Sequence, residues 1–156
     1  MLITPMPRQD VPAYLRGFAD WYVQSLSDVA PRSVDDLQAR VGAYLQPQLD
    51  ADGVPIGSTV FDLHAEEVSQ NVGVVWAGGA DLGFGPLFFV HDLRIHPPFR
   101  GRGFARTALD DIYEIAKAEK SLVGVALSVL ASNTLARELY VSSGFEPVSE
   151  VLLKRF

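Results

Sequence analysis

The chain has 156 residues, a formal net charge of −6, 48% apolar residues and no cysteine. This length predicts a single domain over residues 1–156 that can bury a core. The acidic balance argues against general affinity for nucleic acid or an anionic membrane, and the absence of cysteine excludes disulfides, thiol nucleophiles and Cys-ligated metals. With neither a bilayer-spanning apolar run nor an evident signal peptide, we expect a cytoplasmic protein.

Two helices and a hairpin are expected in the first half of the chain. Apolar side chains recur at helical spacing from Val11 to Leu26, after a capping Asp10. Ser33 begins a second capping sequence. The apolar period then changes to two, as in half-buried strands. The elements predicted here are a short strand at 2–6, helices starting at 11 and 34, and strands at 57–64 and 71–77.

A strand–helix–strand unit dominates the second half. Residues 86–95 form an apolar, β-favouring run, and from Phe104 to about Lys120 the apolar period is helical. Such a unit implies one parallel pair of strands in an otherwise antiparallel sheet. The other elements predicted here are glycine loops at 78–81 and 83–86, a strand at 123–129, a helix at 134–142 ended by Gly144, and closing strands at 145–148 and 151–156.

The loop that opens the helix at Phe104 carries the first functional signal. Gly101 and Gly103 let the backbone turn sharply and approach another group closely. A helix start with free N–H groups binds anions, and Arg100, Arg102 and Arg106 add positive charge. We therefore expect a site for a phosphorylated cofactor. The alternative is a structural turn with solvated arginines.

Known phosphate-binding patterns narrow this expectation. The Walker pattern needs Lys-Ser or Lys-Thr after its second glycine, and the loop has neither. The dinucleotide fingerprint needs a third glycine, where this chain has Arg106, and an acidic residue at the end of the next strand, which is also missing. The pattern that remains is arginine-x-x-glycine-x-alanine, from Arg100 to Ala105.

A second segment, residues 133–145, follows the strand predicted at 123–129. Asn133 is a natural N-cap for the helix there. Tyr140 shares a helix face with Ala136 and can direct its hydroxyl toward the gap between the two apolar strands. The alternative is that Asn133 only caps the helix and Tyr140 only packs.

Together the two segments resemble the GNAT superfamily of acyl-CoA-dependent N-acetyltransferases. The specific motifs cover about residues 86–146, and the order of elements extends the resemblance to the whole chain. The resemblance implies an α/β (α+β) fold: a mixed, mainly antiparallel twisted sheet with flanking helices. Its central parallel pair would splay apart to hold the pantetheine arm of acetyl-CoA like an added strand.

The family pattern assigns roles to individual residues. The backbone of Leu93, Arg94 and Ile95 would hold the pantetheine and the thioester. Tyr140 would protonate the departing thiolate, which suits a phenol of pKa about 10 facing a thiol of about 8.5. The resemblance requires no metal and no covalent nucleophile. The remaining cofactor residues that it implies are Arg100, Gly101, Arg102, Gly103, Phe104, Ala105, Arg106 and Asn133.

The general base is where the chain departs from part of the family. Some members carry a glutamate five residues before the asparagine, and this chain has Ser128 there. His91, at alternate positions with Phe89 and Leu93 on the central strand, is the leading candidate because imidazole titrates near neutrality. One alternative is that His91 is only packed or hydrogen-bonded in the core and has no catalytic role. Another is that a water chain ending at Asp92 takes up the proton.

The acceptor is less well defined by the sequence. Four aromatic residues could line its pocket, although core packing explains them equally well: Trp21, Tyr22, Tyr44 and Trp76. We expect transfer of an acetyl group to a primary amine of a small molecule. The competing hypotheses are a non-catalytic acyl-CoA-binding sensor and a protein or peptide acetyltransferase. A homodimer is an expectation from the resemblance alone.

Overall fold

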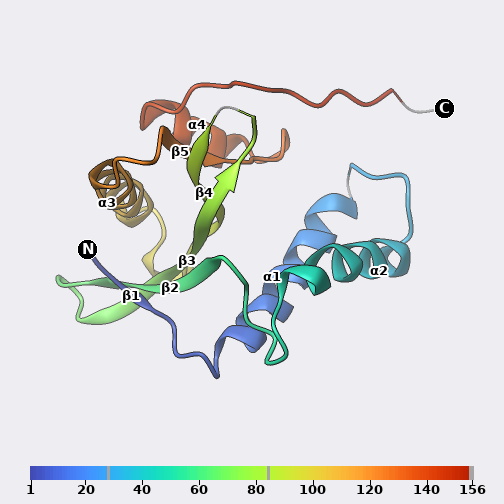
Figure 1. The fold of residues 1–156 in the computed structure, drawn as a ribbon, viewed down its shortest axis with the longest axis horizontal. Coiled ribbons are helices and arrows are strands. Elements are labelled where there is room, and N and C mark those ends of the chain that lie inside the picture. Colours follow the sequence, from blue (N-terminus) through green and yellow to red (C-terminus); the bar gives the residue numbers. More distant parts are fainter. Residues whose placement is uncertain (28, 84, 155–156) are drawn as a thin grey trace.

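The computed structural model describes residues 1–27, 29–83 and 85–154 and contains a five-stranded sheet of order β1-β2-β3-β4-β5 (Figure 1). Neighbouring strands are antiparallel except β4 and β5, which are parallel, as expected. The α3 helix makes the crossover that a parallel connection needs. The strands are β1 (Leu2–Pro5), β2 (Ser58–Ala65), β3 (Gln70–Asp81), β4 (Pro86–Ile95) and β5 (Gly124–Leu127).

Helices cover both faces of the sheet. Val74 and Trp76 of β3 pack with α1 and α2 in one core cluster, whereas Val75 and Ala77 pack with α3 in the other. This alternation follows from the two-residue period of a strand. As expected, Ser33 caps α2 by accepting a hydrogen bond from the Asp36 N–H at 3.3 Å. The helices are α1 (Val11–Ser27), α2 (Val34–Leu45), α3 (Phe104–Ala118) and α4 (Thr134–Ser142).

The parallel strands separate before β4 ends. Their register pairs Leu87 with Gly124 and continues to Val90 with Leu127. The β4 strand then continues to Ile95, where it is paired with β3 alone. One edge of the second half of β4 is therefore left without a neighbouring strand among the described residues, and this opening positions the candidate site.

Two boundaries in the sheet differ from the sequence expectation. Residues 78–81 are not a loop but the end of β3, although Gly-Gly is usually a turn signal. Here the missing side chain serves close packing, because a Cβ at Gly78 would collide with Ser58 on β2. The strand predicted at 123–129 is also shorter, at Gly124–Leu127. The loop predicted at 83–86 includes residue 84, which lies outside the described residues.

The prediction of closing strands was wrong for the described chain. Residues 145–154 form no strand and run outward from α4 as an extended segment (Figure 1). A strand requires a neighbouring backbone to pair with, and this path leads away from the sheet. Residues 155–156, the end of the second predicted strand, lie outside the described part. No helix in that part combines the length and apolarity needed to cross a membrane.

Candidate functional site

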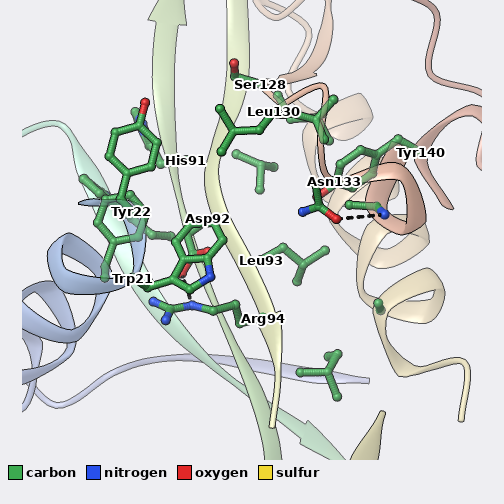
Figure 2. Close-up of a pocket in the computed structure, with 18 of the residues that line it drawn as sticks. Trp21, Tyr22, His91, Asp92, Leu93, Arg94, Ser128, Leu130, Asn133 and Tyr140 are labelled. Atoms are coloured by element: carbon green, nitrogen blue, oxygen red, sulfur yellow. Dashed lines mark hydrogen bonds and ion pairs between the residues drawn. The ribbon is translucent and has the colours of Figure 1, made fainter. Parts of the chain in front are cut away.

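A cavity of about 1140 Å³ lies between the helix pair α1–α2 and the second parallel strand with its helix α4. Figure 2 shows Trp21 and Tyr22 on one side of β4, and Asn133 and Tyr140 on the other. The cavity is lined by every site residue predicted from the sequence except Arg102. The fold thus brings the segments 91–106 and 133–140 to one cavity, whereas the sequence showed them only as two separate motifs.

A β-bulge at His91 sets the geometry of the site. Trp76 of β3 pairs with Asp92 and Ala77 pairs with Val90, so that His91 has no partner across the ladder. A bulge of this kind places two successive residues on the same face of a strand. His91 and Asp92 both face α1, whereas Leu93 packs on the α3 side. His91 and Leu93, although at alternate positions of the strand, therefore face opposite sides of the sheet.

The His91 imidazole lies in an aromatic environment. Its ring stacks on Trp76 at 4.6 Å and contacts Phe89 at 5.0 Å, measured between ring centroids. Burial lowers the pKa of His91 below the usual value for histidine. The ring makes no hydrogen bond to any other described side chain or backbone group. It is therefore a half-buried, neutral imidazole at the cavity wall, chemically able to accept a proton.

Asp92 is the centre of a polar cluster that the sequence did not reveal. Its carboxylate accepts hydrogen bonds from the Tyr14 hydroxyl and from Arg94 Nε, each at 2.7 Å. Asp92 is only 6% exposed, and Tyr14 lies 78 residues away in the chain. Burial and the Asp92 charge raise the pKa of Tyr14, so that it stays a hydrogen-bond donor. The cluster anchors α1 to the bulge.

The Arg94 side chain belongs to the α1 wall of the cavity. Its guanidinium lies between 5.5 and 5.9 Å from the ring centroids of Tyr14, Phe18 and Trp21. Nε donates to Asp92, and the guanidinium also interacts with the Tyr14 hydroxyl. The Arg94 side chain is 28% exposed, and it lines the cavity. It can therefore meet a ligand on this side.

The backbone of β4 divides its amides between two sides. The His96 N–H donates to the Val72 carbonyl of β3 at 2.9 Å. Because successive amides of a strand alternate, the Arg94 amide also faces β3, and those of Leu93 and Ile95 face the opening. Of the three predicted pantetheine residues, Leu93 thus offers its backbone N–H and carbonyl to the opening, and Ile95 offers its N–H, since the Ile95 carbonyl accepts a hydrogen bond from Arg100 Nε. This corrects the expected role of the Arg94 backbone.

The glycine loop has the conformation expected of an anion-binding turn. Gly101 and Gly103 have φ angles of 70° and 84°, in the left-handed region that favours glycine. No side chain caps α3, and its first turn has no acidic residue. A Cβ built on either glycine would meet no atom within 4 Å, so the loop backbone is accessible. These free N–H groups at the start of α3 could hold a phosphate.

The arginines of the loop serve three different purposes. Arg100 Nε donates to the Ile95 carbonyl at 3.0 Å, which fixes the turn after β4. Arg102 stacks on the Phe104 ring at 5.1 Å, outside the cavity lining. Arg106 reaches α4, where it donates to the Ser142 carbonyl at 3.0 Å and the Ser142 hydroxyl at 2.7 Å. The three guanidiniums, expected to add positive charge together at the anion site, therefore have different contacts.

Asn133 and Tyr140 occupy the α4 wall. Asn133 Oδ1 accepts the Ala136 N–H at 3.3 Å, so the residue is the N-cap as expected, and it also lines the cavity. The Tyr140 ring packs edge-on against Phe145 at 5.9 Å. Its hydroxyl makes no hydrogen bond to the rest of the described chain. Burial raises the pKa of Tyr140, with a smaller contribution from the Asp92 charge.

The other residues considered from the sequence differ in how exposed they are at the cavity. Ser128 lines the cavity, as do Trp21, Tyr22, Tyr44 and Trp76. Trp76 is fully buried, whereas Trp21 and Tyr44 are 40% and 67% exposed, so packing alone does not account for the last two. Within the described ranges, no three His, Asp or Glu side chains come together as a metal site would need.

Comparisons with known proteins point to one family. A family model described as the acetyltransferase (GNAT) family matches residues 13–145. The curated protein named "Uncharacterized N-acetyltransferase YycN", from Bacillus subtilis (strain 168), is 25% identical over 159 residues, covering 99% of this chain and 98% of that protein.

Solved structures agree on the fold. The crystal structure of YycN from Bacillus subtilis superposes with a TM-score of 0.84 at 23% identity, covering 99% of this chain and 98% of that one. A mutant of the BH1408 protein from Bacillus halodurans gives a TM-score of 0.66 at 19% identity, covering 100% and 99% of the two chains.

Proposed function

Because this chain belongs to the acetyltransferase (GNAT) family, we propose that it transfers an acetyl group from acetyl-CoA to a primary amine of a small molecule. The observation that carries the proposal is the position of His91 and Tyr140, which line one cavity from opposite walls. A proton acceptor on one side and a proton donor on the other are what direct transfer in a ternary complex requires.

The residues present fit acetyl-CoA. The backbone of Leu93 and the N–H of Ile95 face the open edge of β4, to which an extended pantetheine arm could add as a strand does. The loop at Gly101–Arg106 offers the uncapped amides of α3 for the pyrophosphate. Bound there, the cofactor would supply an activated acyl group as a thioester.

His91 would prepare the acceptor. An amine is protonated near neutral pH and cannot attack until it loses that proton. The neutral imidazole, its pKa lowered by burial, can accept the proton within the cavity. The backbone N–H groups of the β4 edge can polarise the carbonyl under attack. Asp92 is less suited to the role of base, because Tyr14 and Arg94 already bind its carboxylate.

Tyr140 would complete the transfer. As the new C–N bond forms and the C–S bond breaks, the sulfur leaves with the electron pair and needs a proton. The raised pKa of Tyr140 keeps its hydroxyl protonated until a thiolate is present, and the hydroxyl is not engaged by another described group. The proton would then move from the phenol to the sulfur, and the second proton lost by the nitrogen as it becomes an amide, passed through solvent, would restore the phenol.

The acceptor would lie on the α1–α2 side. Trp21, Tyr22 and Tyr44 provide aromatic surface there, and the partly exposed Arg94 guanidinium lines the same side. A cavity of about 1140 Å³ can accommodate a small molecule. The cytoplasmic location and the absence of nucleic-acid and membrane partners stay predictions.

The test is a thiol-release assay with acetyl-CoA against a panel of small amines, amino acids, aminoglycosides and peptides. We expect amine-dependent release of free thiol with at least one small acceptor. Stabilisation by acetyl-CoA in a thermal melt without turnover across the panel would instead support the sensor hypothesis. Acetylation of peptides alone would support a protein-modifying enzyme, and no binding of acyl-CoA would contradict all three.

A further inference from the structure

The charges on the cavity walls are the reverse of those of the whole chain. The chain has 19 acidic residues against 13 Lys and Arg. Among the described residues that line the cavity, the only carboxylate is Asp92, whereas the arginines there are Arg40, Arg94, Arg100 and Arg106. Arg100 and Arg106 belong to the cofactor loop, so Arg40 and Arg94 remain for the α1–α2 side. A ligand on that side therefore meets basic side chains.

The Asp92 carboxylate is turned away from any such ligand. Its side chain is only 4% exposed, and it accepts hydrogen bonds from the Tyr14 hydroxyl and from Arg94 Nε. The Arg94 side chain is 28% exposed. A guanidinium carries five N–H donors, and its contacts with Asp92 and Tyr14 do not exhaust them. The wall thus presents hydrogen-bond donors to the cavity, which a carboxylate of a ligand could accept and an ammonium group could not.

The Arg94 guanidinium is also held in a fixed position. The bond from Nε to Asp92 is 2.7 Å long, and the rings of Phe18 and Trp21 lie 5.9 and 5.5 Å from the guanidinium carbon. A long side chain that is already ordered loses little conformational entropy when a ligand binds. The buried cluster at the bulge therefore prepares Arg94 for recognition.

An aromatic surface connects Arg94 with the proposed base. The His91 ring stacks on Trp76 at 4.6 Å, Trp76 packs edge-on against Phe18 at 5.3 Å, and Phe18 contacts Arg94. Figure 2 shows His91 and Arg94 on the same side of β4. A small ligand lying along this surface would have one end at the imidazole, the other at the guanidinium, and an apolar body between them.

We propose that the acceptor is a small amine that carries a carboxylate and an apolar body, and that the Arg94 guanidinium binds this carboxylate. The role given to the amine, at His91, rests on the proposed acetyl transfer. Polyamines and aminoglycosides carry several positive charges, which Arg40 and Arg94 would repel. Arg94 is then the residue that determines which acceptors are used.

The first test compares acceptors that differ in one charge. Thiol release from acetyl-CoA is measured with ε-aminocaproate against its amide, and with free phenylalanine against its amide. In at least one pair the carboxylate member should have a KM about tenfold lower, because only a carboxylate forms a charge-assisted hydrogen bond with the guanidinium. Spermidine should be a poorer acceptor than that member. Equal KM values within both pairs, or a preference for spermidine, would overturn the proposal.

The second test removes the guanidinium. In Arg94→Gln the preference for the carboxylate member should disappear, so that the ratio of the two KM values falls toward one. Arg16→Gln is the matched control, because it removes the same charge from an exposed residue of α1 outside the cavity lining, and it should keep the preference. Circular dichroism verifies folding. If Arg94→Gln does not fold, Asp92→Asn is combined with it, which leaves no buried carboxylate without a partner. A preference that survives removal of the guanidinium would contradict the proposal.

The third test measures binding without transfer. Trp21 and Trp76 line the cavity, so their fluorescence reports a ligand there, and coenzyme A replaces acetyl-CoA so that no acyl group can move. The carboxylate member should bind about tenfold more tightly than its amide, and this difference should be lost without the guanidinium. Such binding with no thiol release would reject acetyl transfer and retain the carboxylate site. Thiol release without discrimination in either pair would reject the carboxylate site and retain acetyl transfer.

Discussion

Replacing Tyr140 by phenylalanine removes only the hydroxyl that is proposed to protonate the thiolate. The ring can keep its edge-on contact with Phe145 at 5.9 Å. Because the hydroxyl has no hydrogen-bond partner in the described chain, the free energy of unfolding should change by less than about 0.5 kcal/mol. Loss of a general acid typically slows the chemical step by about 10²- to 10⁴-fold, which corresponds to roughly 2.7–5.4 kcal/mol in activation free energy.

The assay measures kcat by release of free thiol with a saturating amine, and Kd for acetyl-CoA by titration. Tyr140→Phe should lower kcat and leave Kd within about twofold, since the hydroxyl is assigned to catalysis and not to binding. Tyr113→Phe is the control, because Tyr113 is 50% exposed on α3 and does not line the cavity. Unchanged kcat in Tyr140→Phe, with the protein folded, would refute the assignment.

Three further substitutions test the rest of the site. His91→Gln should lower kcat about 10²-fold. In the unsubstituted protein, kcat should fall on the acidic side at a pH below the usual histidine pKa, and this fall should be absent in His91→Gln. An unaltered pH profile would exclude His91 as the base. Because burial lowers that pKa in the folded state, the His91 contribution to stability is present above about pH 6.5 and lost as the pH falls; urea unfolding across this range should show a weaker pH dependence in His91→Gln. Asp92→Asn should lower the free energy of unfolding in urea by about 3 kcal/mol, because Arg94 loses its buried partner; a change under 1 kcal/mol in that experiment would argue against the cluster as an anchor. Arg106→Gln should raise the KM for acetyl-CoA about fivefold, because it breaks the hydrogen bonds that hold α4 to α3. Arg102→Gln is the control and should leave the KM unchanged. An equal rise in KM in both variants would indicate that the arginines act only through their charge.

The sequence by itself predicted most of the elements and the local geometry of the loop and helix starts that are proposed to hold the cofactor. Local patterns suffice for these features, because the capping by Ser33 and Asn133 depends on neighbouring backbone, and the turn at Gly101 and Gly103 depends on φ angles that glycine permits. The strand–helix–strand order around Phe104 predicted the parallel pair, which the sheet confirms.

Only the tertiary structure decided how the α1–α2 side of the cavity is built. The bulge at His91 arises from the register between β3 and β4, and register depends on both strands together. The bond from Tyr14 to Asp92 joins residues 78 positions apart, and Arg106 meets Ser142 across two helices; no local pattern encodes such pairings. Residues 145–154 show the same limit. They have the composition of a strand, but a strand forms only beside a neighbouring backbone, and these residues do not pair with the free edge of β5.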